Sequence, residues 1–311
     1  MNRREIFPLV AGAAGMAAAS DLGAAEKSHP GPELKRVSYQ SKRTGKERDY
    51  FVYLPPGHAQ KKDWPVMLFL HGDGERGDGK GDLDYVLMHG PLFEAWCQKR
   101  DLPFIIISPQ LPVFGRGEMP YIKDRKLDEI PSRRAEGINP RPDTIKGDIR
   151  LPGRMDGKAA DDKLPQGPKG LIDGWYEIED EVIAMVDRTV ASFKGDPKRV
   201  YLTGLSYGGF GAWYLAARHA QKFAALAPIV GYGHPEHAAP IVAAKLPLWV
   251  FAGGRDPVVP LRYFYPVLNK LESLGHPEVR FTNHEDMGHF TWVRVYEGDD
   301  LYSWLLKQSR A

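Results

Sequence analysis

The chain has 311 residues, with 42 lysines and arginines against 40 aspartates and glutamates and a formal net charge of +2. So balanced a charge gives no reason to expect nucleic acid or an anionic membrane surface as a partner. The length is enough for one α/β domain with a large core, and the single cysteine, Cys97, excludes an internal disulfide.

Residues 1–25 have the composition of an export signal. A pair of arginines at positions 3 and 4 precedes a short apolar stretch of small residues, which resembles a bacterial twin-arginine signal. This stretch is too short for stable insertion across a membrane. We therefore expect residues 26–311 to form the mature protein, exported folded to the periplasm or secreted. The alternative is a cytosolic protein with a basic tail.

The first folded elements are predicted to be strands. Alternating residues at 34–40 and 50–54 indicate two antiparallel lead-in strands joined by a turn at 44–46. The apolar runs 66–70 and 104–108 are typical of parallel strands buried on both faces, with a helix over about 83–98 between them.

A glycine-rich loop, 71–77 (His-Gly-Asp-Gly-Glu-Arg-Gly), follows the strand at 66–70. Such a backbone can turn its amide groups towards a ligand, and Asp73 and Gly74 are the candidates to bind a developing negative charge there. The loop almost matches a nucleotide-binding P-loop, but position 81 is glycine where a magnesium-binding serine or threonine is required. Its acidic residues do not follow the calcium-loop pattern either, and no zinc-ligand spacing occurs. We expect no metal and no cofactor.

The regular alternation stops over residues 111–173, which are rich in proline, glycine and charged residues. Loops of this length inside a domain are usually functional or disordered. Because its apolar residues are sparse, we expect this segment to be a cap or rim insertion over the site, within a single domain.

The strand–turn–helix pattern returns after a predicted helix at 177–193. A strand at 200–203 enters the pentapeptide Gly-Leu-Ser-Tyr-Gly at 204–208, and an alanine-rich helix follows at 209–219. This arrangement is typical of a nucleophile elbow, in which Ser206 stands at a sharp turn above the sheet and glycines allow the close approach. Five residues can match by chance, so the partners of the serine decide.

A serine needs a base, and the base needs an orienting acid. Asp256 follows a predicted strand at 248–252, and His289 follows the last one, at 279–282. Ser206, Asp256 and His289 stand in the order found in α/β-hydrolases. Taken alone, Asp256 is better explained as a turn residue that caps the next helix, and it is the joint order and spacing of the three residues that favour the triad.

Other residues compete for these roles. The alternative histidines are His234, His237 and His284, and Asp286 is a second acid, although it lies too close to His289 in sequence for the usual geometry.

The predicted fold is therefore an α/β-hydrolase fold, a mostly parallel sheet of about eight strands flanked by helices, with strands also at 224–230 and helices at 261–274 and the C-terminus. The backbone amide of Tyr207 is the expected first oxyanion donor, and that of Asp73 or Gly74 the second. Four side chains near predicted strand ends or site loops are candidate substrate contacts, with ordinary packing as the alternative: His71, Trp175, Tyr232 and Trp292.

Five segments together resemble one branch of the α/β-hydrolases, namely 70–77, 108–110, 204–209, 288–292 and 301–306. It is the secreted bacterial phospholipase/carboxylesterase-like branch, related to predicted peptidases, feruloyl esterases and polyhydroxybutyrate depolymerases. The resemblance implies a serine carboxylic-ester hydrolase without a cofactor, acting on a small-molecule or polysaccharide-linked ester such as an acyl or feruloyl ester. The insertion departs from the family pattern and leaves the substrate open.

Two other functions remain. A serine peptidase of the prolyl-oligopeptidase type shares the triad and fold, but usually carries a propeller or other gating domain for which we find no sequence here. A non-catalytic binding protein on this scaffold is expected to lose a triad member, and all three are present. The sequence does not indicate an oligomeric state.

Overall fold

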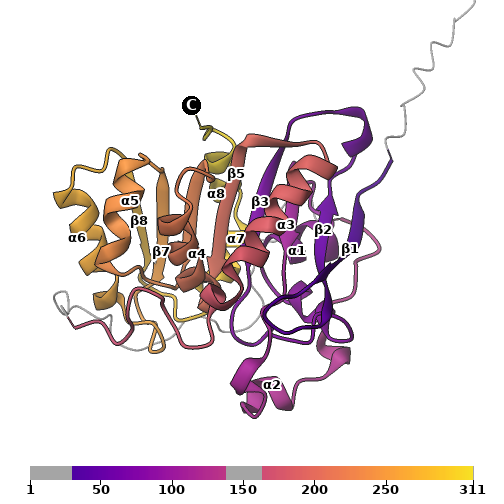
Figure 1. Ribbon diagram of the computed structural model, residues 1–311, viewed down its shortest axis with the longest axis horizontal. Helices are drawn as coiled ribbons and strands as arrows, with labels where there is room; N and C mark the ends of the chain where they lie inside the picture. Colours follow the sequence, from indigo (N-terminus) through magenta and orange to yellow (C-terminus); the bar gives the residue numbers. More distant parts are fainter. Residues whose placement is uncertain (1–29, 138–162, 311) are drawn as a thin grey trace, which may run out of the picture.

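The structure is a computed structural model that describes residues 30–137 and 163–310 (Figure 1). The predicted export signal, 1–25, and the centre of the predicted insertion, 138–162, lie outside the described residues. No helix in the described ranges has the length and apolar character needed to cross a bilayer.

The described strands form one sheet in the order β1-β2-β4-β3-β5-β6-β7-β8. Strand β2 pairs antiparallel with β1 and with β4, and the neighbouring pairs from β4 to β8 are parallel. This confirms the predicted α/β-hydrolase sheet with its antiparallel lead-in. The strands are β1 (Glu33–Gln40), β2 (Glu47–Leu54), β3 (Trp64–Leu70), β4 (Ile105–Ser108), β5 (Gly195–Leu205), β6 (Ala225–Ile229), β7 (Leu248–Gly253) and β8 (Val279–His284).

Helices cover both faces of the sheet (Figure 1). In β3, Val66 and Leu68 pack into the core on one face, whereas Met67 and Phe69 pack into the core on the other. Both sets are fully buried, which explains why the strand is apolar throughout rather than alternating. The first core is shared with α3 (Glu179–Ser192), α4 (Tyr207–Arg218), α5 (Ala238–Ala243) and α6 (Tyr265–Ser273), and the second with α1 (Gly90–Leu92), α7 (Thr291–Glu297) and α8 (Asp300–Leu305).

The single helix predicted over 83–98 is wrong. The segment instead makes a 3₁₀ turn (Leu83–Leu87), the short α1 and a π turn (Phe93–Cys97). Gly90 has a φ of +84°, and a Cβ there would lie 2.2 Å from the ring of Phe69. Proline at position 91 then lacks the N–H that a continuous helix would use.

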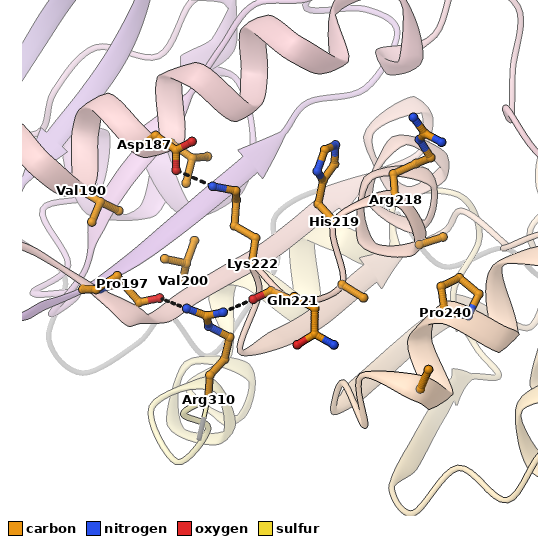
Figure 2. A pocket seen from close by; sticks show the side chains of 14 residues that line it. Asp187, Val190, Pro197, Val200, Arg218, His219, Gln221, Lys222, Pro240 and Arg310 are labelled. Carbon is orange, nitrogen blue, oxygen red and sulfur yellow. Dashed lines mark hydrogen bonds and ion pairs between the residues drawn. The ribbon is translucent and has the colours of Figure 1, made fainter.

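A cavity of about 640 Å³ lies at the amino end of β5 (Figure 2). Its wall includes Pro197 and Val200, at the opposite end of the strand from the predicted nucleophile. The charged side chains there already have partners: Lys222 pairs with Asp187, and Arg310 donates to two backbone carbonyls. None of the predicted site residues lines this cavity.

Candidate active site

Ser206 stands at a sharp turn between β5 and α4. Its φ of 50° and ψ of −117° lie far from both strand and helix, and its own N–H donates to the carbonyl of Ile229 at 3.0 Å. The two neighbouring glycines have no room for a side chain. A Cβ on Gly204 would lie 2.3 Å from the carbonyl oxygen of Gly208, and a Cβ on Gly208 would lie 1.9 Å from that of Leu70. The elbow therefore requires both glycines.

Alanine at position 208 is expected to destabilise the fold by about 3 kcal/mol or more, because its methyl group would overlap the backbone of β3. Thermal unfolding of Gly208→Ala measures this. Gly81→Ala is the matched control, since a Cβ there meets nothing closer than 3.6 Å, and its stability should stay within about 1 kcal/mol of the original. An unchanged melting temperature in Gly208→Ala would mean that this close approach does not exist.

Asp256 follows β7 and is buried. One carboxylate oxygen, Oδ1, accepts the backbone N–H groups of Val258 at 2.8 Å and Val259 at 2.9 Å. The other, Oδ2, lies 2.8 Å from Nδ1 of His289. The two explanations that the sequence left open therefore hold together: Asp256 caps the following turn and also orients the histidine.

His289 completes a chain of hydrogen bonds to the serine. Its Nε2 lies 3.0 Å from Oγ of Ser206, while Nδ1 faces the Asp256 carboxylate. Gly253, at the end of β7, brings the loops together, because even a Cβ there would lie 2.3 Å from the carbonyl oxygen of Gly288. The three side chains thus meet at the carboxyl edge of the parallel sheet, where open α/β sheets place their ligands.

The competing residues lie elsewhere. Asp286 forms an exposed two-pronged ion pair with Arg294, with both N–O distances 2.7 Å. His237 contacts the carbonyl of Pro168 at 2.6 Å, and the ring of His234 packs against His237. His284 stacks on Phe251.

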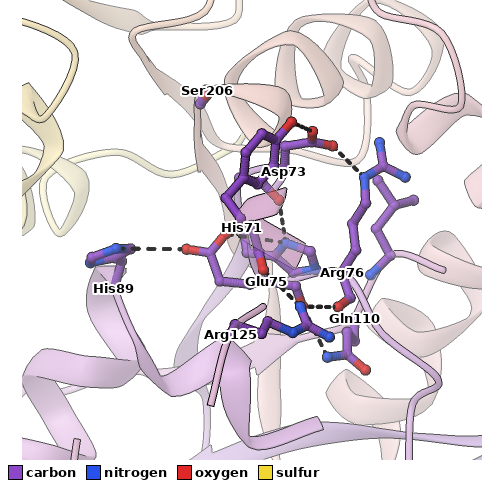
Figure 3. A network of polar contacts seen from close by, with 12 residues as sticks. His71, Asp73, Glu75, Arg76, His89, Gln110, Arg125 and Ser206 are labelled. Carbon is purple, nitrogen blue, oxygen red and sulfur yellow. Dashed lines mark hydrogen bonds and ion pairs between the residues drawn. The ribbon is translucent and has the colours of Figure 1, made fainter. Parts of the chain in front are cut away.

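The loop after β3 lies beside the nucleophile and is held by charged side chains (Figure 3). A Cβ on Gly72 would lie only 3.7 Å from Cβ of Ser206. The Asp73 carboxylate accepts from Arg76 Nε at 2.5 Å, Arg116 Nε at 2.8 Å and the Tyr121 hydroxyl at 2.5 Å. These contacts hold the side chain of Asp73 in place, and Asp73 and Gly74 line the same cavity as Ser206.

Comparisons with known proteins agree with this fold. The model of the dienelactone hydrolase family matches residues 159–291. A solved thermostable esterase is 25% identical, with a TM-score of 0.57, over 89% of this chain and 63% of its own length. The chain has the α/β-hydrolase fold.

Two further solved structures are similar to this α/β-hydrolase in fold. The S-formylglutathione hydrolase of Staphylococcus aureus is 14% identical over 89% of this chain and 98% of its own, with a TM-score of 0.55. The acylaminoacyl peptidase of Pyrococcus horikoshii is 14% identical over 90% of this chain and 42% of its own, with a TM-score of 0.53. No curated protein sequence matches the chain. The family match and the esterase support the predicted enzyme class, a carboxylic-ester hydrolase.

The hydroxyl of Ser206 opens into a cavity of about 610 Å³. The wall contains both apolar and charged side chains, so the cavity suits a substrate that has an apolar group and a polar group. Lining side chains that the sequence did not single out as substrate contacts include Leu171, Phe210, Val259, Tyr263 and Phe290 in the apolar part, and Glu75, His89, Arg116, Tyr121 and Gln166 in the polar part.

Glu75 is a buried acid in this wall that the sequence analysis did not single out. Burial raises the pKa of its carboxyl to about 7. Its Oε1 lies 3.9 Å from Nε2 of His89, whose own pKa is lowered to about 4 by burial (Figure 3). The sequence shows a glutamate at position 75 of the loop 71–77, but it does not show that this side chain is buried.

Besides Ser206 and His289, five predicted residues line the cavity, namely Asp73, Gly74, Tyr207, Tyr232 and Trp292. The prediction is wrong for His71 and Trp175, which are absent from its wall and almost fully buried. The N–H of Leu111 donates to Nε2 of His71 at 2.9 Å, and Nδ1 donates to the carbonyl of Gly72 at 2.6 Å. Trp175 packs edge-on against His71. Both side chains therefore support the loop 71–77 through buried contacts and do not line the cavity.

The described ranges contain no cluster of three or more histidine, cysteine, aspartate or glutamate side chains that would hold a metal ion.

Proposed function

We propose that this α/β-hydrolase is a serine esterase that cleaves carboxylic esters through an acyl-enzyme. The observation that carries this function is the unbroken chain from the Asp256 carboxylate through His289 to Oγ of Ser206, at the wall of a cavity. A serine hydroxyl becomes a nucleophile at neutral pH when a base so oriented removes its proton.

The reaction has two steps. Nε2 of His289 takes the proton as Oγ of Ser206 forms a bond to the carbonyl carbon, and the oxygen that becomes negative accepts from the backbone N–H of Tyr207 and of Asp73 or Gly74. The bond to the alcohol oxygen then breaks, and the alcohol leaves with the proton from His289. Water repeats the sequence on the acyl-enzyme and releases the acid. Asp256 stabilises the imidazolium in both steps.

The proposal extends to the cellular location of the protein and to its substrate class. The paired arginines and the apolar stretch within residues 1–25 favour export of the folded protein to the periplasm or beyond. An exported esterase meets polymers outside the cytoplasm, so acyl or feruloyl esters on polysaccharides are the substrates we propose. Fractionation of cells that express the full chain tests the address, and release of free acid from acylated or feruloylated polysaccharide tests the substrate.

The activity itself is tested with p-nitrophenyl acetate, butyrate and octanoate, methyl ferulate and a peptide p-nitroanilide, assayed side by side. We expect ester turnover, and we expect a fluorophosphonate to abolish it while labelling Ser206, as mapped by mass spectrometry of the modified peptide. Turnover of the anilide alone would favour the serine peptidase. No turnover of any of these substrates, together with no label on Ser206, would overturn the proposal in favour of a binding protein.

A further inference from the structure

Tyr232 lies in the cavity wall, and its hydroxyl is buried. Tyr232 follows β6, is 4% exposed and lines the cavity next to Ser206. Its Oη has no hydrogen-bond partner in the part of the chain that the structure describes. Burial raises the pKa of this phenol, so the group stays protonated and can donate. An unsatisfied buried polar group is destabilising, and such groups are few in folded proteins.

Three other buried tyrosines have hydroxyl partners. Tyr201 donates to the carbonyl of Gln308 at 2.9 Å, Tyr296 lies 2.9 Å from the hydroxyl of Thr203, and Tyr302 donates to the carbonyl of Tyr296 at 2.8 Å. The orphan hydroxyl is therefore not a general feature of these cores. It occurs at the wall of the cavity that holds the nucleophile.

Aromatic packing fixes the ring of Tyr232. Phe210 meets it edge-on with ring centroids 4.7 Å apart, Tyr263 lies at 5.3 Å and Phe264 at 6.1 Å. A ring held on these sides cannot swing out to solvent to satisfy its hydroxyl. Phe210 and Tyr263 also line the cavity, so the ring of Tyr232 belongs to an apolar part of the wall.

We infer that Tyr232 Oη donates a hydrogen bond to an oxygen atom of the substrate, so that the enzyme selects esters whose apolar group packs against Phe210 and Tyr263 and bears an acceptor oxygen. The inference rests on the proposed esterase function and adds the substrate class. A site with a buried donor discriminates against an analogue that lacks the acceptor, because the donor is then left unpaired. Nε1 of Trp292 is a second unpartnered buried donor in this wall, but its ring packs 5.1 Å from that of His289, so Tyr232 is the cleaner position to change.

The test compares esters that differ by one acceptor atom. Methoxy and ethyl groups have nearly the same shape, but only methoxy offers an oxygen. The probes are p-nitrophenyl 3-phenylpropanoates with methoxy or ethyl at ring position 2, 3 or 4, and benzyl butyrates substituted in the same way, so that both sides of the ester are sampled. We expect at least one methoxy ester to exceed its ethyl partner about tenfold in kcat/KM. Tyr232→Phe should abolish that preference, so that this variant gives the same kcat/KM for the methoxy ester as for its ethyl partner.

Stability separates binding from structure. Tyr232→Phe removes a hydroxyl that has no partner among the described residues, so its melting temperature should stay the same or rise. Tyr214→Phe is the matched control outside the cavity: its hydroxyl donates to Glu179 at 2.6 Å, so the variant should melt lower and keep the methoxy preference.

A fall in the melting temperature of Tyr232→Phe with no change in preference would assign the hydroxyl to the fold and overturn the inference. Ser206-dependent hydrolysis with equal rates for every methoxy and ethyl pair would also overturn it, and would leave the proposed esterase intact. Failure of the enzyme to turn over any ester would defeat both.

Discussion

Replacing Ser206 by alanine is expected to lower kcat/KM for p-nitrophenyl butyrate by about 10⁵-fold, because removal of a serine nucleophile costs nearly all of the catalysis that a triad supplies. The remaining activity would come from the oxyanion donors and from binding alone. Initial rates over a range of enzyme concentrations measure the loss.

The fold should not suffer in this variant. Oγ of Ser206 makes a 3.0 Å contact with His289, and the elbow depends on the flanking glycines and on the backbone bond from Ser206 to Ile229. Ser206→Ala should therefore melt within a few degrees of the original chain. Retention of activity within tenfold would show that a different nucleophile acts in this cavity.

Much of the fold follows from period and burial. Parallel strands covered on both faces must be apolar throughout, so β3 and β7 are visible as apolar runs, while the alternation in β1 marks a strand at the sheet edge. The triad follows from its order and its loop positions, because the carboxyl ends of parallel strands meet at one edge. The sequence alone therefore predicts that these distant loops lie close together.

The predictions that were wrong concern positions whose structure depends on contacts with residues distant in the sequence. Gly90 reads locally as one weak position in a helix, but its φ of +84° and the ring of Phe69 packed against it, followed by Pro91, end the helix there. His71 stands in the site loop, but the amide of Leu111, 40 positions away, turns its ring inwards. Two polar side chains of the cavity wall, Arg116 and Tyr121, belong to residues 111–173, which the sequence predicts as a cap or rim insertion. Both are positioned by hydrogen bonds to the Asp73 carboxylate.

Asn at position 256 is expected to lower kcat about 10⁴-fold, because both carboxylate oxygens of Asp256 accept hydrogen bonds. An amide offers one acceptor oxygen. If it faces the N–H groups of Val258 and Val259, the NH₂ group faces His289 and imposes the tautomer with hydrogen on Nε2, which cannot take the serine proton. If it faces His289, the NH₂ group meets two backbone donors and the loop loses its cap. Either orientation damages the site.

Asp286→Asn is the matched control, since it makes the same chemical change three residues from His289. Its carboxylate pairs with Arg294 at the surface, where such ion pairs contribute about 1 kcal/mol or less. We expect activity within twofold of the original in this variant. Comparing kcat for the two variants decides which acid serves His289: a large loss in Asp286→Asn with a small one in Asp256→Asn would reverse the assignment, and equal losses would show that both loops hold the histidine in place.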